Sequence, residues 1–97
     1  MPTFVVERYV PGISRADAEA VILAEARQAD AMVSEGRSVR ILHATLMEGD
    51  EAVMSVVEAP CRDDVVELGE RSGAPADRIV PAIAVETKGA PTDGGAA

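Results

Sequence analysis

Hydrophobic and polar positions along this chain follow two periodicities that alternate. Four short runs rich in β-branched residues have the spacing of strands, and two longer stretches place apolar residues three and four positions apart, as helices do. The predicted order is strand, helix, strand, strand, helix, strand. This order is typical of an α+β ferredoxin-like fold, a βαββαβ unit with one four-stranded antiparallel sheet.

Turn and capping signals give the bounds of these elements. Strands are predicted at residues 3–10, 39–47, 51–59 and 78–86, and helices at residues 15–35 and 61–72. Ser14 and Gly36 suit the two ends of the first helix, and Glu48-Gly49-Asp50 has the chemistry of a hairpin turn. Pro81 donates no backbone hydrogen bond, so the last strand is expected at an edge of the sheet.

The predicted strands carry apolar residues on both sides, so both sheet faces need to be covered. Alternation places Phe4, Val6, Arg8 and Val10 on one face of the first strand, and Val5, Glu7 and Tyr9 on the other. The first helix has a predicted buried stripe of Ala18, Ile22, Ala26, Ala29 and Val33. Two helices can cover only one face of four strands. The other face is therefore expected to meet a partner subunit, a ligand or both.

Composition and charge narrow the choice of partners. The 97 residues suit one domain, here residues 1–87, followed by a Gly- and Pro-rich stretch at 88–97 that is expected to be a disordered tail. Seventeen acidic and nine basic residues give a formal charge of −8, which disfavours nucleic acid and anionic membranes as partners. The single cysteine, Cys61, excludes an internal disulfide. With no secretion signal and no apolar run of about 18 residues, a cytoplasmic location is expected.

Three motifs resemble those of one bacterial family. Val6-Glu7-Arg8 lies near the end of the first strand, Glu58-Ala59-Pro60 ends the third, and Gly73-Ala74-Pro75-Ala76-Asp77-Arg78 leads into the fourth. Over residues 3–86 the chain is thus similar to a family of small nickel-binding, ferredoxin-like proteins, long catalogued as a domain of unknown function. The resemblance implies a homodimer of the dimeric α/β-barrel type, in which two four-stranded sheets pack together, and a bound nickel ion.

The chain departs from that family at metal-binding residue types. A histidine common after Val-Glu-Arg is Tyr9 here, one usual in the second helix aligns with Leu68, and a third-strand cysteine becomes Ser55. Imidazole and thiolate suit nickel, and His43 is the one imidazole left. Several aromatic positions have also become small or aliphatic. Either the core has closed up, or a cavity between the sheets holds a small molecule.

The candidate catalytic residues are His43 and Arg8. Imidazole is the side-chain type suited to proton transfer at neutral pH, so His43 is the candidate acid or base, and a guanidinium such as that of Arg8 can stabilise an oxyanion. His43 and Glu7 are also the candidate metal ligands. Alternation predicts that His43 shares a face with Ile41 and Thr45. Each of these polar residues also has an ordinary structural explanation, as a bonded core side chain or an ion pair.

The remaining candidates are ligand-binding residues. They are Glu7, Tyr9, Thr45 and Glu58. Because the first and third strands are neighbours in the expected sheet, Glu58 is expected near Arg8 or Glu7. Tyr9 is either a hydrogen-bond donor in the site or a residue at the rim of the dimer interface.

Three classes of function fit these residues. The first is a homodimer that binds a metal ion or a small ligand in a pocket on the sheet face. The second is a cofactor-independent enzyme, such as an isomerase, cyclase or monooxygenase-like barrel, in which His43 transfers protons and Arg8 stabilises an oxyanion. The third is a non-catalytic dimer that regulates or scaffolds a partner.

Overall fold

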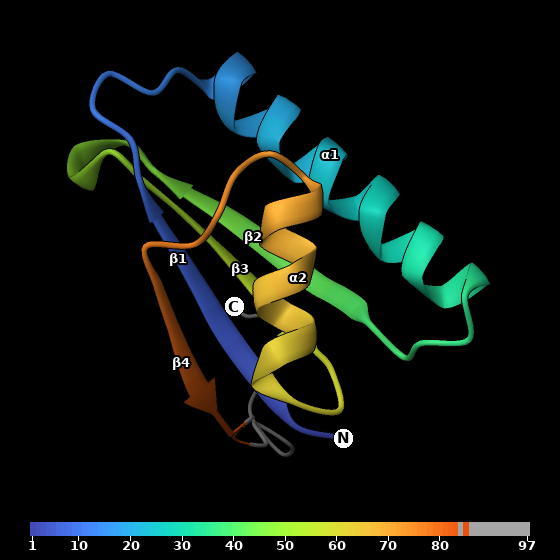
Figure 1. The fold of residues 1–97 in the computed structure, drawn as a ribbon. Coiled ribbons are helices and arrows are strands. Elements are labelled where there is room, and N and C mark those ends of the chain that lie inside the picture. Colours follow the sequence, from blue (N-terminus) through green and yellow to red (C-terminus); the bar gives the residue numbers. More distant parts are fainter. Residues whose placement is uncertain (84, 86–97) are drawn as a thin grey trace, which may run out of the picture.

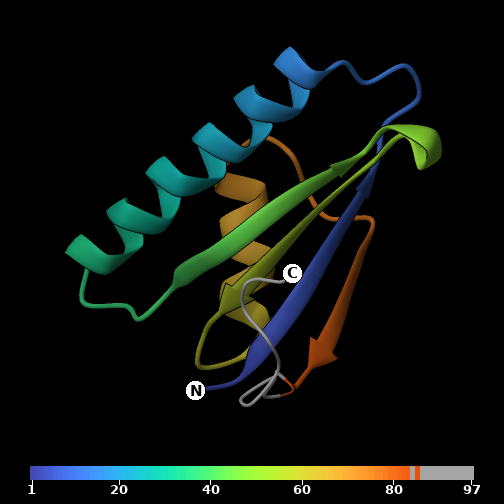
Figure 2. The ribbon, with the colours of Figure 1, turned by 180° about the vertical axis from the view of Figure 1, so that it is seen from behind.

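The computed structural model describes residues 1–83 and 85 and has the predicted order of elements. They are β1 (Thr3–Tyr9), α1 (Arg15–Ser34), β2 (Arg40–Met47), the 3-10 turn η1 (Glu48–Asp50), β3 (Ala52–Glu58), α2 (Arg62–Arg71) and β4 (Arg78–Ala82). The strands form one antiparallel sheet in the order β2-β3-β1-β4, and both helices lie on one side of it (Figures 1 and 2). The α+β ferredoxin-like fold is confirmed.

The ends of the elements follow the predicted signals. Ser14 caps α1, since its Oγ accepts from the backbone N–H of Asp17 at 3.1 Å while the Asp17 carboxylate accepts from the Ser14 N–H at 3.3 Å. Gly36 follows α1 with a φ of 86°, a conformation that glycine adopts without strain. Pro81 lies on β4, which is an edge strand as predicted.

Two predictions fall wholly or partly outside the described residues. These are the tail at residues 88–97 and the last part of the strand predicted to reach residue 86. Neither described helix has the length and apolarity that a membrane crossing requires.

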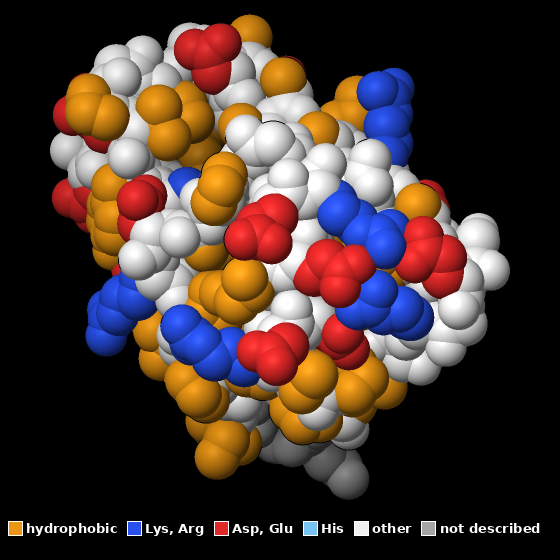
Figure 3. Space-filling model, viewed as in Figure 1, with side chains coloured by type: hydrophobic (Ala, Val, Ile, Leu, Met, Phe, Trp, Pro, Cys, Tyr) orange, Lys and Arg blue, Asp and Glu red, His pale blue; other side chains and the backbone are white. Residues whose placement is uncertain are grey.

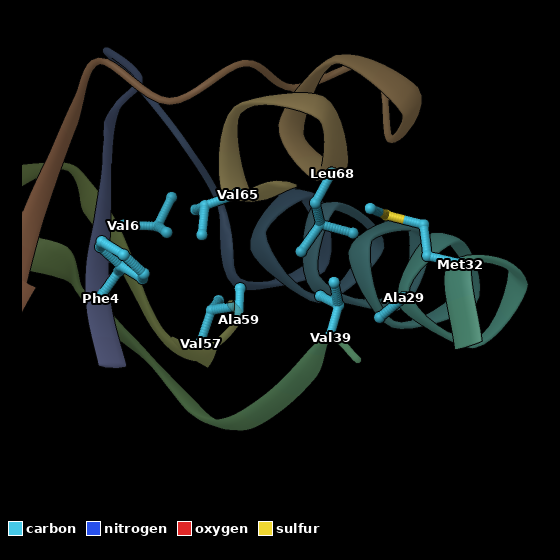
Figure 4. Close-up of a cluster of buried hydrophobic side chains, with 9 residues drawn as sticks. All are labelled: Phe4, Val6, Ala29, Met32, Val39, Val57, Ala59, Val65 and Leu68. Atoms are coloured by element: carbon cyan, nitrogen blue, oxygen red, sulfur yellow. The ribbon is translucent and has the colours of Figure 1, made fainter. Parts of the chain in front are cut away.

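The core lies between the sheet and the two helices (Figure 4). Phe4 and Val6 of β1 and Val57 of β3 face Val65 and Leu68 of α2. The other members of this cluster are Ala29, Met32, Val39 and Ala59. Besides Phe4, only small and aliphatic side chains fill it, so aromatic rings supply little of the packing area of this core.

The predicted buried stripe of α1 is partly wrong. Ala18 and Ala29 are buried as expected, but Val33 is 54% exposed and its place is taken by Met32. Glu25, a charged residue, is buried on the same stripe. The predicted and observed stripes share Ala18 and Ala29, so the buried side of α1 is turned by less than one residue position, toward Glu25 and Met32.

Glu25 is buried as part of an ion pair with Arg8. Arg8 and Glu25 are 2% and 1% exposed, and the Nη2 of Arg8 donates to Oε2 of Glu25 at 2.7 Å. The Oγ of Ser55 donates to the same carboxylate oxygen at 3.3 Å, and the Nε of Arg8 donates to the carbonyl of Ala74 at 2.7 Å. One arginine thus joins β1 to α1, to the connection between α2 and β4 and, through the carboxylate, to β3.

A second group of charges joins the helices at the surface. Arg37, just after α1, bonds to Asp64 and Glu67 of α2, and Arg71 of α2 bonds to Glu35 at 2.8 Å. These charges gather over α2 and the end of α1 (Figure 3). Hydrogen bonds from Arg37 hold the pKa of Glu67 down to about 2. Because the pairs are partly exposed, we expect each to add little to stability.

We predict that the Arg8–Glu25 pair is strongly coupled. Arg8→Met should lower the free energy of unfolding by about 3–5 kcal/mol, because it leaves the Glu25 carboxylate buried without a cation. Adding Glu25→Leu to that variant should restore most of the loss, since two apolar groups need no partner. Urea unfolding at neutral pH, followed by circular dichroism, measures both.

The matched control is the exposed pair of Arg15 and Glu19 on α1, whose Nε–Oε2 distance is 3.1 Å. Arg15→Met should cost less than about 1 kcal/mol. If the losses in the Arg8→Met and Glu25→Leu single variants simply add in the double variant, the two side chains are not coupled and this account of the core is wrong.

Candidate functional site

The sheet face opposite the helices is the candidate site, and we call it the open face. Figure 2 views the molecule from this side, with the helices behind the strands. The strand register arranges the side chains of the open face in rows that run from β2 to β4. The rows are Arg40, Glu58, Thr3, Ala82; then His43, Val56, Val5, Val80; then Thr45, Met54, Glu7, Arg78; and finally Met47, Ala52, Tyr9.

The middle of the open face is apolar and its charges are paired. Val5, Val56 and Val80 lie side by side in one row, with Met54 in the next. The four charged side chains form two pairs within the face. Nη1 of Arg78 lies 3.5 Å from Oε2 of Glu7, and Nη2 of Arg40 lies 3.6 Å from Oε1 of Glu58. The side chains of the four rows therefore carry no net formal charge, on a chain whose total is −8.

A polar cluster at one end of the open face centres on Glu7. Glu7 is 6% exposed, and its carboxylate accepts a hydrogen bond from the Tyr9 hydroxyl while pairing with Arg78. The backbone N–H of Tyr9 donates to Oδ2 of Asp77 at 2.7 Å, and the N–H of Asp77 donates to the Glu7 carbonyl at 2.9 Å. These bonds fasten the end of β1 to the start of β4.

Glu7 also makes the Tyr9 phenol harder to ionise. The hydrogen bond to the Glu7 carboxylate, helped by partial burial and the negative charge of that carboxylate, raises the pKa of the Tyr9 phenol above its ordinary value of 10.0. At neutral pH the phenol is therefore a hydrogen-bond donor. Both carboxylate oxygens of Glu7 have partners, the Tyr9 hydroxyl and Arg78. The cluster therefore holds these polar side chains in fixed positions beside the apolar rows.

His43 lies on the open face because β2 contains a β-bulge. Ile41 is opposite Val57, whereas His43 is opposite Val56, so Leu42 is the extra residue between them. The prediction that His43 shares a face with Thr45 is correct, but the prediction that it shares one with Ile41 is wrong. Ile41 packs against the core on the helix side, and the bulge has reversed the alternation.

The predicted metal ligands do not come together within one chain. His43 is on β2 and Glu7 on β1, in different rows, so their Cα atoms are roughly 12 Å apart from the ordinary strand spacing and rise. The Glu7 carboxylate is already bound to Tyr9 and Arg78. Among residues 1–83 and 85, no group of three or more His, Cys, Asp and Glu side chains could hold a metal ion. The donors of a single chain thus do not fit the nickel ion that the resemblance implies.

The predicted catalytic pair of His43 and Arg8 is separated by the sheet. Arg8 points to the helices, where it is bonded to Glu25, while His43 points the other way. No ligand on the open face can contact both. The sequence could not show which face Arg8 occupies, because its buried partner is a glutamate 17 positions along the chain. Arg8 is therefore a structural residue.

The other candidates divide in the same way. Thr45 lies on the open face beside Met54, in the row that ends with Glu7 and Arg78. The expectation that Glu58 lies near Arg8 or Glu7 is wrong. Glu58 is paired with Thr3 at the opposite end of β1, and its carboxylate is near Arg40.

Sequence reasoning missed two groups of residues. Arg78 and Asp77 complete the Glu7 cluster, and the signal for them was their position at the start of the last strand, directly beside the first in the expected sheet. Glu25 had no such signal, because nothing in its neighbourhood marks a buried carboxylate.

Two hollows lie between α1 and β2. One, of about 520 Å³, is lined by Ala29, Val33 and Ile41 among others, and the second, of about 460 Å³, by Ile22, Ala44 and Leu46 among others. Of the candidate ligand-binding residues, Glu58 lines the first hollow and Thr45 lines the second, whereas His43, Glu7 and Tyr9 line neither. A second surface placed over the open face would be needed to enclose a ligand there.

Of the comparisons with known proteins, the one with solved structures supports the fold. No family model matches the chain, and no curated protein matches it. A solved structure is similar, that of SCO4226 from Streptomyces coelicolor A3(2), with a TM-score of 0.69 and 19% sequence identity over 87% of this chain and 99% of that one. At this identity the likeness establishes the shared fold alone.

We predict that the single tyrosine reports on Glu7. Tyrosinate absorbance in a pH titration should give a pKa above 10.0 for Tyr9 in the wild type, and Glu7→Gln should lower it toward that value. Because the folded pKa is the higher one, this contact stabilises the fold below about pH 10 and is lost as pH rises through the folded pKa. Glu58→Gln, on the same face but in another row, should leave the titration unchanged. An equal shift in both variants would contradict the proposed contact.

Proposed function

We propose that the protein is a homodimer whose two open faces pack on each other and enclose a site for a small organic ligand. The observation that carries this proposal is the open face itself, four strands wide, apolar in its middle rows and free of net charge. A chain of this size buries a smaller share of its surface than larger domains do, so covering this face would add burial where it is most needed.

Charge favours a second copy as the cover. Two chains of −8 each repel, and only a surface without net charge lets them approach without further repulsion. The open face meets this condition because Glu7 and Glu58 are each neutralised by an arginine from a neighbouring strand. Its valine and methionine rows supply the apolar contact that dimer interfaces use.

The polar groups at the margins of the apolar rows suit a small organic ligand. His43 and Thr45 stand on β2, and the Tyr9 phenol stands on β1. An apolar space with a few fixed donors and acceptors is the usual form of such a site. The enzymatic hypothesis required His43 and Arg8 to act on the same ligand. Because the sheet separates these two side chains, we propose ligand binding rather than catalysis. A metal site would need donors from both subunits.

The dimer is tested at the centre of the open face. Val56→Lys should convert the dimer to a monomer in light scattering after size exclusion, because it buries two ammonium groups between apolar rows. The control is Leu23→Lys on α1, an exposed leucine on the helix side, which should leave the dimer intact. A wild-type protein that is a monomer at all concentrations, or a dimer that Leu23→Lys alone dissociates, would overturn the proposal.

The ligand is tested separately. Mass spectrometry of the purified dimer under native conditions should show a bound small molecule that is absent from the Val56→Lys monomer and reduced in a His43→Ala dimer. Titration with nickel, using protein without an affinity tag, should show no saturable site. Saturable binding of one nickel ion per dimer, lost in His43→Ala, would replace the organic ligand with a shared metal site.

A further inference from the structure

Several apolar residues of α1 are not covered by the rest of the chain. The hydrophobic pattern places Ile22, Ala26 and Val33 on the stripe that should be buried, yet none of them is buried and Val33 is 54% exposed. Leu23, beside Ile22, is 51% exposed. Ile22 and Leu23 line the smaller of the two hollows between α1 and β2, Val33 lines the larger, and Ala26 lines both. Apolar side chains gathered in this way are typical of a binding surface.

The two hollows meet at Ala26 and follow α1 along β2, and together we call them the α1–β2 groove. Residues 15–26 of the helix line the smaller hollow and residues 26–33 line the larger one. β2 supplies the opposite wall, with Ala44 and Leu46 at the smaller hollow and Ile41 at the larger. Since β2 is an edge strand beside α1, the groove is open to solvent (Figures 1 and 2). Hollows of about 460 and 520 Å³ have the size of small-molecule sites.

The charges that line the groove leave one carboxylate without a counter-ion. Arg37 is bonded to carboxylates of α2, and Arg40 lies 3.6 Å from Glu58. The two charged residues of the smaller hollow pair with each other. Within residues 1–83 and 85, no positively charged side chain lies within ion-pair distance of the carboxylate of Asp30, which lines the larger hollow. On a chain of charge −8, the ligand that complements this groove is therefore a cation.

We propose that the α1–β2 groove binds an aliphatic amine, with the apolar chain in the smaller hollow and the ammonium group in the larger one near Asp30. The apolar chain would lie against Ile22, Leu46 and Val53, and the small side chains of Ala26 and Ala44 leave the space for it. This site goes beyond the ligand proposed between the open faces, because the groove is complete within one chain.

The probe for this site is octylammonium, an aliphatic cation, and octanoate is the matched anion. Calorimetric titration of the full-length protein at neutral pH should show one octylammonium ion bound per chain. Octanoate should bind at least about tenfold more weakly, because its charge is repelled by Asp30 and by an acidic chain. Failure of octylammonium to saturate a site, or equal affinity for the two probes, would overturn the proposal.

Asp30→Asn tests the ammonium end of the site. It should weaken octylammonium binding by about two- to fivefold, the effect of one exposed ion pair. The control is Glu70→Gln on α2, which removes the same charge from an exposed residue that lines neither hollow, and it should leave the affinity unchanged. An equal loss in both variants would mean that the cation responds only to net charge, and the role given to Asp30 would be wrong.

Ala26→Leu tests the apolar part of the site, at the point where the hollows meet. The larger side chain should weaken octylammonium binding by about tenfold, the share of roughly two buried methylene groups. Circular dichroism verifies that the variant is folded. If it is not, Ala44→Leu fills the smaller hollow from β2 and should give the same loss. Unchanged affinity in the folded variant would overturn the groove as the binding site.

The Val56→Lys monomer separates this site from the ligand proposed between the open faces. Val56 lines neither hollow, so octylammonium should bind the monomer as tightly as it binds the wild type. Loss of binding in the monomer would place the amine between the open faces and overturn the groove site.

Discussion

The structure depends on one geometric constraint, that two helices cover only one face of a four-stranded sheet. On the covered face, Phe4 and Val6 pack against α2, and the alternation of β1 then fixes Val5, Glu7 and Tyr9 on the other side. Every feature of the proposed dimer and its ligand site lies on that second side. The chain keeps it apolar in the middle and neutralises its carboxylates with arginines from adjacent strands.

The buried pair of Arg8 and Glu25 fixes how α1 lies on the covered face of the sheet. An ion pair in an apolar interior is weak evidence for stability, because both charges lose their hydration. Its geometry gives another reason for its presence. Small and aliphatic side chains such as Ala18 and Ala29 would allow α1 to rotate over the sheet with little change in packing, whereas a guanidinium bonded to one carboxylate admits a single rotation. We infer that the pair specifies the position of α1 more than it stabilises the fold.

Much of the fold could be predicted from the sequence, because local signals determine it. The cap at Ser14, the turn at Glu48–Asp50 and the proline in β4 each depend on residues a few positions apart. The candidate site was predicted less well, because it depends on which residues meet across strands. The sequence alone does not show which end of β1 Glu58 lies next to. Only the strand register shows that it lies opposite Thr3, with its carboxylate near Arg40 and far from Glu7. Glu25 was missed because a lone glutamate in a helix reads as a solvent-facing residue until its buried partner is known.

The extra residue Leu42 makes β2 sensitive to changes in chain length. The side-chain alternation before Leu42 is out of phase with the alternation after it. Ile41 therefore points to the helices and His43 points away, although they are two positions apart. Removing Leu42 would restore plain alternation and send either the isoleucine into water or the imidazole into the core. A relative that lacks this one-residue insertion would therefore carry its histidine on the opposite side of the sheet, even where an alignment places the two residues in one column.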